Sequence, residues 1–190
     1  MPHVAEEDLW SFSLELYARP GVKERCINLQ DALGLDVNIA FFCLWWSDPS
    51  ATYLDQNAFD AIIAPAVRWH RTVVLPTRAA RKASKGGMAN LPAGQTGDLY
   101  RALLKVEIDT EHAEQTILVG GAVEHTGTLP SGLRVSASRA ALNIALYSSH
   151  LGRKMDVQDF DDMAAIIALC CGVPPQTALS HLSASVSSIG

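Results

Sequence analysis

The run from Val37 to Trp46 constrains the fold of this chain more than any other segment. It reads VNIAFFCLWW, is almost entirely apolar, and lies between Asp36 and Asp48-Pro49. An aspartate side chain accepts hydrogen bonds from the free N–H groups of a first helical turn, so Asp36 is a good N-cap. A helix that is apolar on every side must be buried on every side. We therefore predict that residues 36–47 form the buried central helix of a bundle.

Apolar residues recur at helical spacing along most of the remaining chain. Val22, Cys26, Leu29 and Leu33 are four, three and four residues apart, and Gly34 follows as a C-terminal cap in the left-handed conformation. Further helices are predicted to begin at residues that can serve as N-caps: Asp8, Asp55, Asp98, Ser136 and Asp156. Asp159, three residues after Asp156, predicts a capping box. Two prolines, at positions 65 and 76, should kink or restart the helix that begins near Asp55.

The fold class predicted from these patterns is all-α. We expect a single domain over residues 1–190, an irregular bundle of six to eight helices, with the helices near 10–33 wrapping the central one. Residues 84–97 (SKGGMANLPAGQTG) are rich in glycine, proline and small polar residues, which predicts an exposed, flexible loop. The serine-rich tail, about 183–190, is predicted to be frayed.

Composition favours a folded protein of the cytoplasm. Apolar residues make up 48% of the 190 and charged residues 18%, which argues against disorder. No apolar run reaches the roughly 20 residues that cross a bilayer, and the start of the chain lacks the pattern of a secretory signal. The four cysteines show no C-x-x-C spacing, so we expect free, buried thiols in a reducing compartment and predict no metal or other cofactor.

Charge is distributed unevenly. The chain carries a net charge of −5, but residues 61–97 contain six basic residues and no acidic one, which leaves −11 for the remainder. We call this set the basic segment: Arg68, Arg71, Arg78, Arg81, Lys82 and Lys85. Arginine forks suit carboxylates and phosphates, so one interpretation is a helix face that binds an acidic protein partner or RNA. The alternative is a solvated face paired with acidic residues of the next helix.

A stripe of glutamates offers such a partner. Glu107, Glu111 and Glu114 are spaced i, i+4 and i+7, so they share one face of the predicted helix. His112 points about 100° away from Glu111. Di-iron bundles use Glu-x-x-His pairs on two helices, and neither that order nor a second copy occurs here. Ion pairs between this stripe and Arg78 and Arg81 are therefore favoured over a metal site.

Polar residues near the predicted core suggest a further site. Asn28, Gln30, Asp31 and Asn38 could line a small pocket together with two tryptophans, at positions 10 and 46. Buried polar side chains must be hydrogen-bonded, and residues of this kind more commonly cap neighbouring helices. Both interpretations stay open at this point.

The first 40 residues resemble a known family. The resemblance rests on these residues: Leu9-Trp10-x-Phe12-Ser13, Tyr17-x-x-Pro20-Gly21-Val22, Cys26, Leu29-Gln30-Asp31, Gly34 and Asp36-Val37-Asn38. They are similar to the head of an uncharacterised family of small, all-α-helical bacterial proteins. The resemblance implies a helical cytoplasmic protein from a bacterium. It implies no activity, and no functional residue carries over from it.

Three functions are compatible with these features. The preferred hypothesis is a non-enzymatic binding or adaptor module that uses the basic segment. The first alternative is a small-molecule or metal-dependent enzyme with its site at Glu107, Glu111 and Glu114. The second alternative is a structural homo-oligomer. No catalytic residue is predicted, since the sequence contains no nucleophile elbow, P-loop or dinucleotide-binding motif.

Overall fold

A computed structural model describes residues 3–85, 93–131 and 134–189, with side chains from Leu9 onward except at position 93. Within these ranges the chain is helical and contains no strand. The elements are α1 (His3–Tyr17), α2 (Val22–Leu33), α3 (Val37–Trp45), α4 (Gln56–Trp69), the π-helix η1 (His70–Val74), α5 (Leu75–Lys85), α6 (Ala93–Thr126), α7 (Ala137–Ser148), α8 (Val157–Cys171) and α9 (Pro175–Ile189). Helices α4, η1 and α5 follow one another without a break. Counted as one helix, they bring the total to the upper limit of the predicted six to eight, and the all-α prediction is confirmed.

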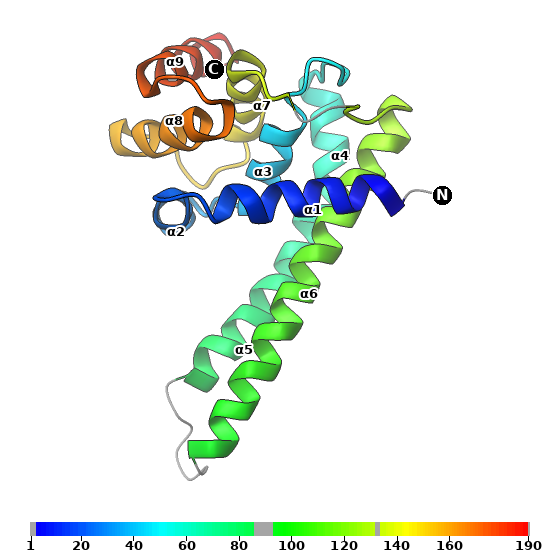
Figure 1. Cartoon of the computed structure of the whole chain (residues 1–190), viewed down its shortest axis with the longest axis vertical. Coiled ribbons are helices and arrows are strands. Elements are labelled where there is room, and N and C mark those ends of the chain that lie inside the picture. Colours follow the sequence, from blue (N-terminus) through cyan, green and yellow to red (C-terminus); the bar gives the residue numbers. More distant parts are fainter. Residues whose placement is uncertain (1–2, 86–92, 132–133, 190) are drawn as a thin grey trace.

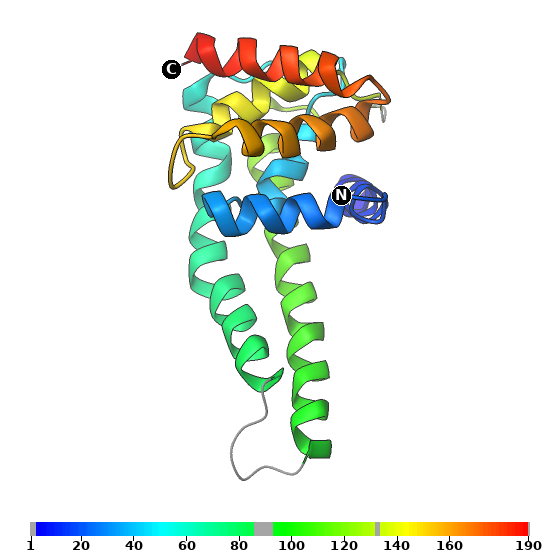
Figure 2. The ribbon, with the colours of Figure 1, turned by 90° about the vertical axis from the view of Figure 1, so that its left-hand side faces the viewer.

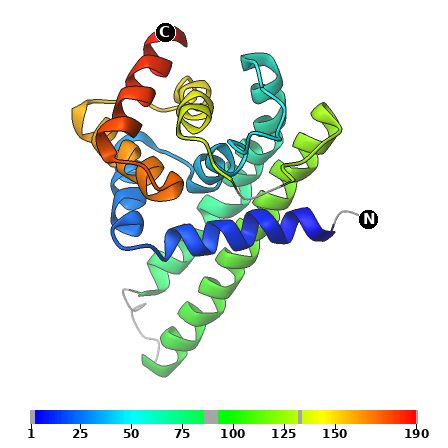
Figure 3. The same ribbon diagram turned by 45° about the horizontal axis from the view of Figure 1, so that its top comes forward.

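The molecule has two parts of different build (Figures 1 and 2). The continuous helix α4–η1–α5 runs antiparallel to the 34-residue α6. At one end these two helices project without any other element beside them. We call this projection, α5 together with residues 93–106 of α6, the arm. The remaining elements form the head, and α1 crosses α6 where the head meets the arm (Figures 1 and 3).

Helix α3 lies at the centre of the head, as predicted. Its N-cap is Asp36, whose Oδ1 accepts a hydrogen bond from the Asn38 N–H at 2.9 Å. Every residue from Ile39 to Trp45 is buried. Helices α1, α6 and α7 pack against α3, whereas α2 packs mainly against α8. The predicted wrapping of α3 by the helices near 10–33 therefore holds for α1 only.

Several predicted helix ends are confirmed. Gly34 has a φ of 68° and caps α2, and Asp55 caps α4 by accepting from the Ala58 N–H at 2.8 Å. Asp156 and Asp159 form the predicted capping box at the start of α8. Asp98 is not a cap, because α6 begins earlier, at Ala93.

Two segments that were expected to be irregular are helical in part. Ser84 and Lys85 still belong to α5, and residues 93–97 belong to α6, so the loop prediction is wrong at these positions. Residues 86–92 lie outside the described residues. The tail predicted to be frayed over 183–190 is helical to Ile189, because Leu182 is buried and Val186 packs against the core.

The sequence also predicts free, buried thiols and no helix that crosses a membrane. Cys26, Cys43 and Cys170 are free and buried, as expected, and Cys171 is free and half-buried. In the described part of the chain, no single helix has the length and apolar character needed to cross a bilayer. Helices α8 and α9 meet that test only as a pair bent by 119°.

Candidate functional site

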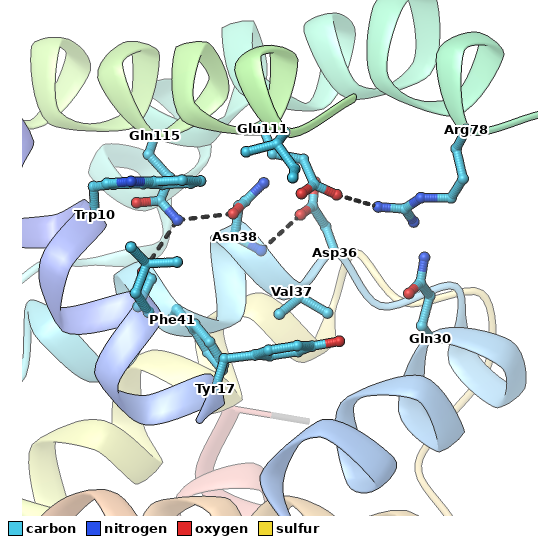
Figure 4. A pocket seen from close by; sticks show the side chains of 13 residues that line it. Trp10, Tyr17, Gln30, Asp36, Val37, Asn38, Phe41, Arg78, Glu111 and Gln115 are labelled. Carbon is cyan, nitrogen blue, oxygen red and sulfur yellow. Dashed lines mark hydrogen bonds and ion pairs between the residues drawn. The ribbon is translucent and has the colours of Figure 1, made fainter. Parts of the chain in front are cut away.

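A cavity of about 250 Å³ lies where the head meets the arm (Figure 4). It is enclosed by α1, α2, α3, α5 and α6, which are brought together by the crossing of α1 over α6. We call it the junction pocket, and its lining consists of Trp10, Ser13, Leu14, Tyr17, Gln30, Asp36, Val37, Asn38, Phe41, Arg78, Ile108, Glu111 and Gln115. The pocket therefore joins the first three helices of the chain to α5 and α6, which come much later in the sequence.

The lining combines aromatic surface with polar side chains. Trp10 lies over the His112 ring, with their centroids 4.6 Å apart, and Tyr17 lies edge-on to Phe41 at 6.3 Å. Figure 4 shows Trp10 and Gln115 on one side of the pocket and Arg78 on the other. Ligand sites typically have this composition, an apolar wall with a few well-placed polar groups.

A hydrogen-bond chain fixes the polar side chains of one wall. The Gln115 amide nitrogen donates to Asn38 Oδ1 at 2.8 Å and to Ser13 Oγ at 3.1 Å. The Asn38 amide nitrogen donates in turn to Glu114 Oε2 at 2.7 Å. Because Asn38 donates at its nitrogen and accepts at its oxygen, and Gln115 donates twice, these side chains are held in one orientation. The chain leads from the pocket to a buried cluster behind it.

That cluster consists of Asp36, His70 and Glu114, which come from the cap of α3, the first residue of η1, and α6. His70 Nδ1 lies 2.8 Å from Asp36 Oδ2 and 3.2 Å from Glu114 Oε1. The Asp36 N–H donates to the Tyr147 hydroxyl oxygen at 2.8 Å, which ties the cluster to α7. Asp36 is the member that also lines the pocket.

Burial and charge give the cluster unusual protonation. Burial raises the pKa of Glu114 to about 8, with the Asp36 carboxylate adding to the effect and His70 opposing it. Burial disfavours charge on His70, but the two adjacent carboxyl groups outweigh it and raise the pKa of His70 to about 10. Burial would also raise the pKa of Asp36, yet contact with His70 holds it below the ordinary value. At neutral pH the cluster can thus both donate and accept protons.

Arg78 occupies the opposite wall. Its Nε donates to Glu107 Oε1 at 2.9 Å and its Nη2 donates to Glu111 Oε1 at 2.6 Å. Arg81 also pairs with Glu107. Burial alone would raise the pKa of Glu107, but the two guanidinium groups hold it below the ordinary value. The third nitrogen of the Arg78 fork, Nη1, has no partner.

Buried polar atoms without hydrogen-bond partners gather at this pocket. Within the described residues, five such side-chain atoms occur: Asp36 Oδ2, Gln56 Oε1, Arg78 Nη1, Glu114 Oε1 and Gln115 Oε1. Three belong to residues that line the pocket, and Glu114 lies directly behind it. Most buried polar atoms in folded proteins are paired, so this concentration needs an explanation.

The structure divides the basic segment in two. Arg78 and Arg81 form ion pairs with Glu107 and Glu111, which is the pairing expected between this segment and the glutamate stripe. The other four are exposed, and no ion pair is seen for them within the described residues: Arg68, Arg71, Lys82 and Lys85. Whether those four bind a partner stays a prediction.

The glutamate stripe is likewise divided. Glu107 and Glu111 face the arginines of α5, while Glu114 faces His70 and Asn38. Two polar residues predicted near a pocket, Gln30 and Asn38, do line it together with Trp10. Asn28 instead donates to Asp162 on α8 at 3.2 Å, and Trp46 does not line the pocket.

Sequence reasoning missed the two most informative residues. The sequence patterns predict Asp36 only as a helix cap and give His70 no role. The sequence signal was the position of His70 between Pro65 and Pro76, where a helix must adjust its register. The π-helix that begins at His70 is such an adjustment, and π-helices occur frequently at functional sites.

Comparisons with known proteins give a family and no activity. A family model described as "Protein of unknown function (DUF2390)" matches residues 8–118. That range is more than half of the chain and contains every residue that lines the junction pocket as well as Asp36, His70 and Glu114. No curated protein and no solved structure matches the chain.

Proposed function

We propose that this chain, which belongs to the DUF2390 family of proteins of unknown function, binds a small organic molecule in the junction pocket. Family membership indicates no activity, so the proposal rests on the site itself. The observation that carries the proposal is that two buried polar atoms of the pocket lining, Arg78 Nη1 and Gln115 Oε1, have no hydrogen-bond partner. A bound molecule with matching groups would supply the missing hydrogen bonds.

The unpartnered atoms indicate the chemistry of the ligand. Gln115 Oε1 is an acceptor, so it calls for an N–H or O–H donor on the molecule, and Asp36 Oδ2, which is already paired with His70, has a second lone pair that could accept another. Arg78 Nη1 is a donor and calls for an acceptor or an anionic group. The aromatic side chains of Trp10 and Tyr17 favour a flat ring between these polar ends. These features together fit a planar nitrogen heterocycle or aromatic amine that also carries an acceptor.

A thermal-shift screen would test the proposal. The full chain is heated with and without millimolar nucleobases, aromatic amines and aromatic amino acids, and the intrinsic tryptophan fluorescence, to which Trp10 contributes, is followed in parallel. A ligand at about one hundred times its Kd adds roughly 2.7 kcal/mol to stability, enough to move the melting temperature by several degrees. Failure of the whole set to shift either signal would contradict the proposal.

A pocket-filling variant gives the matched control. Leu14 lines the pocket and its side chain is 53% exposed, so Leu14→Trp should narrow the pocket without disturbing the core. Leu169 on α8 is 39% exposed and lies away from the pocket, so Leu169→Trp makes the same substitution elsewhere. We expect ligand shifts to disappear in the first variant and to persist in the second.

The other expectations from the sequence remain proposals. The exposed part of the basic segment supports binding of an acidic protein or RNA, and four residues rather than six are free for it. A homo-oligomer, a cytoplasmic location and a bacterial source stay as predicted. Charge reversal at Lys82 and Lys85 would test the binding of an acidic partner without touching the ion pairs of Arg78 and Arg81.

A further inference from the structure

The buried cluster behind the junction pocket has the form of a metal-binding site. Asp36, His70 and Glu114 each offer one ligand atom, and these atoms all lie within 4.8 Å of one another. They come from three separate elements, the cap of α3, η1 and α6. Their convergence is therefore a tertiary feature and not an accident of neighbouring sequence positions.

Each carboxylate of the cluster has one oxygen hydrogen-bonded to Asn38 and one oxygen that faces His70 Nδ1. Asp36 Oδ1 accepts from the Asn38 backbone N–H at 2.9 Å, and Glu114 Oε2 accepts from the Asn38 side chain at 2.7 Å. The other two oxygens, Asp36 Oδ2 and Glu114 Oε1, are buried, and both lie beside His70 Nδ1. This is the arrangement in which outer-shell hydrogen bonds orient carboxylates that each bind a metal ion through one oxygen.

The spacing of the ligand atoms fits a metal ion. Two ligands bound at about 2.1 Å are about 3.0 Å apart when they meet at a right angle, and about 3.4 Å apart at the tetrahedral angle. His70 Nδ1 lies 2.8 Å from Asp36 Oδ2 and 3.2 Å from Glu114 Oε1. Small adjustments of the three side chains would therefore place all three atoms on one ion.

We propose that Asp36, His70 and Glu114 bind one divalent transition-metal ion at the inner wall of the junction pocket. One imidazole and two carboxylates suit Zn²⁺, Fe²⁺ or Mn²⁺, and three protein ligands leave positions open for water or a ligand atom. Since Asp36 also lines the pocket, those positions can be reached from it. The proposal goes beyond small-molecule binding and does not depend on it.

Calorimetry with the metal alone tests the site. The full chain is stripped with chelator, desalted, and titrated with ZnCl2 and, separately, with MnCl2. We expect one ion per chain, with Zn²⁺ bound at least tenfold more tightly than Mn²⁺ according to the usual order of affinities. The melting temperature of the stripped protein should rise when Zn²⁺ is restored. A stripped wild-type protein that binds neither ion, and whose melting temperature neither ion changes, would overturn the proposal.

Isosteric variants assign the ligands. Glu114→Gln and Asp36→Asn keep the size of the side chains, and asparagine remains a good N-cap for α3. Each should weaken Zn²⁺ binding at least tenfold. His150 on the surface lies 2.9 Å from Asp60, so His150→Gln controls for an exposed histidine–carboxylate pair and should leave binding unchanged. Zn²⁺ affinity that survives both cluster variants, or that disappears in His150→Gln, would refute the assignment.

The test also separates the metal site from the small-molecule pocket. Leu14→Trp narrows the pocket but changes none of the three metal ligands. It should therefore retain Zn²⁺ binding while it loses organic ligands. Loss of Zn²⁺ binding in Leu14→Trp would contradict the placement of the ion among Asp36, His70 and Glu114.

Discussion

Asp36 has two structural roles at the same time. Its Oδ1 caps α3, and its Oδ2 faces His70 in the buried cluster. A cap needs only one carboxylate oxygen, so the other is available for chemistry. Asp36 therefore starts α3, the buried helix at the centre of the head, and also belongs to the cluster beside it. The fold and the site depend on the same side chain.

Glu114 should make the metal-free protein less stable as pH rises. Its pKa goes from an ordinary 4.5 to about 8 in the folded protein, so between these values the unfolded chain loses a proton that the folded chain keeps. Stability therefore falls over that range. The pKa of His70 goes from 6.5 to about 10, and the stability that its charge provides is lost as pH rises through about 10. Melting temperatures in chelator should be several degrees lower at pH 9 than at pH 5.5.

Glu114→Gln isolates the contribution of this carboxyl group. Glutamine cannot ionise, and it keeps the size of the side chain and an oxygen that can accept from Asn38. We expect similar melting temperatures for the two proteins near pH 5, and a variant that melts roughly 5 °C higher than wild type at pH 9. Parallel curves for wild type and variant across this range would show that Glu114 ionises normally in the fold.

How far the site could be predicted differs from residue to residue. Asp36 could be placed as a cap because capping is local, and the pairing of Glu107 with Arg78 followed from helical spacing on neighbouring helices. The meeting of Asp36, His70 and Glu114 could not be predicted, since their separations of 34 and 44 residues are bridged only by tertiary packing. Nothing in the spacing of these residues distinguishes them from isolated polar side chains.

At the scale of the element, the π-helix η1 explains how one long helix keeps contact with α6 through both α4 and α5. Each residue of an α-helix advances by about 100°, and a π turn contains about one residue more, which changes the phase of the helix beyond it. Helix α4 turns Phe59, Ile62 and Ile63 into the core, with Ile62 against Gly121 of α6, and beyond the phase change α5 turns Arg78 and Arg81 toward the same helix. Pro76 lies just after η1, so its ring and its missing N–H fall next to the turn in which the helix already departs from α geometry.

Two adjacent glycines of α6 give a matched test of the contact between α4 and α6. A Cβ on Gly121 would lie 3.1 Å from the Ile62 carbonyl oxygen and 3.5 Å from Ile62 Cα, whereas a Cβ on Gly120 would meet nothing within 4 Å. Glycine inside a helix is less favourable than alanine, so Gly120→Ala should stabilise the protein by about 0.5 kcal/mol. Gly121→Ala must push two helix backbones apart and should destabilise it by about 1 kcal/mol. Chemical denaturation measures both, and a gain for Gly121→Ala would disprove the close approach.

At the scale of the whole molecule, the head and the arm are stabilised by different forces. The head contains one continuous apolar core that includes residues of α1 to α4 and of α6 to α9. In the arm, Ser84 is the one buried residue within α5 and residues 94–106. Arg78 and Arg81 join α5 to Glu107, and Arg81 also lies over the Tyr100 ring at 5.8 Å from its centroid. Regions with few buried apolar contacts open at lower free energy than the core does.

Native-state hydrogen exchange should therefore show two levels of protection. We expect amides of α5 and of residues 94–106 to exchange through local opening, while those of α3 and α7 exchange only with global unfolding.

Glu107 is 5% exposed and pairs with both arginines, so Glu107→Gln leaves two cations short of a partner. Since loss of one member of a buried ion pair is strongly destabilising, exchange in the arm should accelerate by at least about tenfold. The Lys105–Asp109 pair of the same helix is 78% and 60% exposed, so Asp109→Asn should leave exchange unchanged. An equal acceleration in α3 would mean that the arm and the head unfold as one unit.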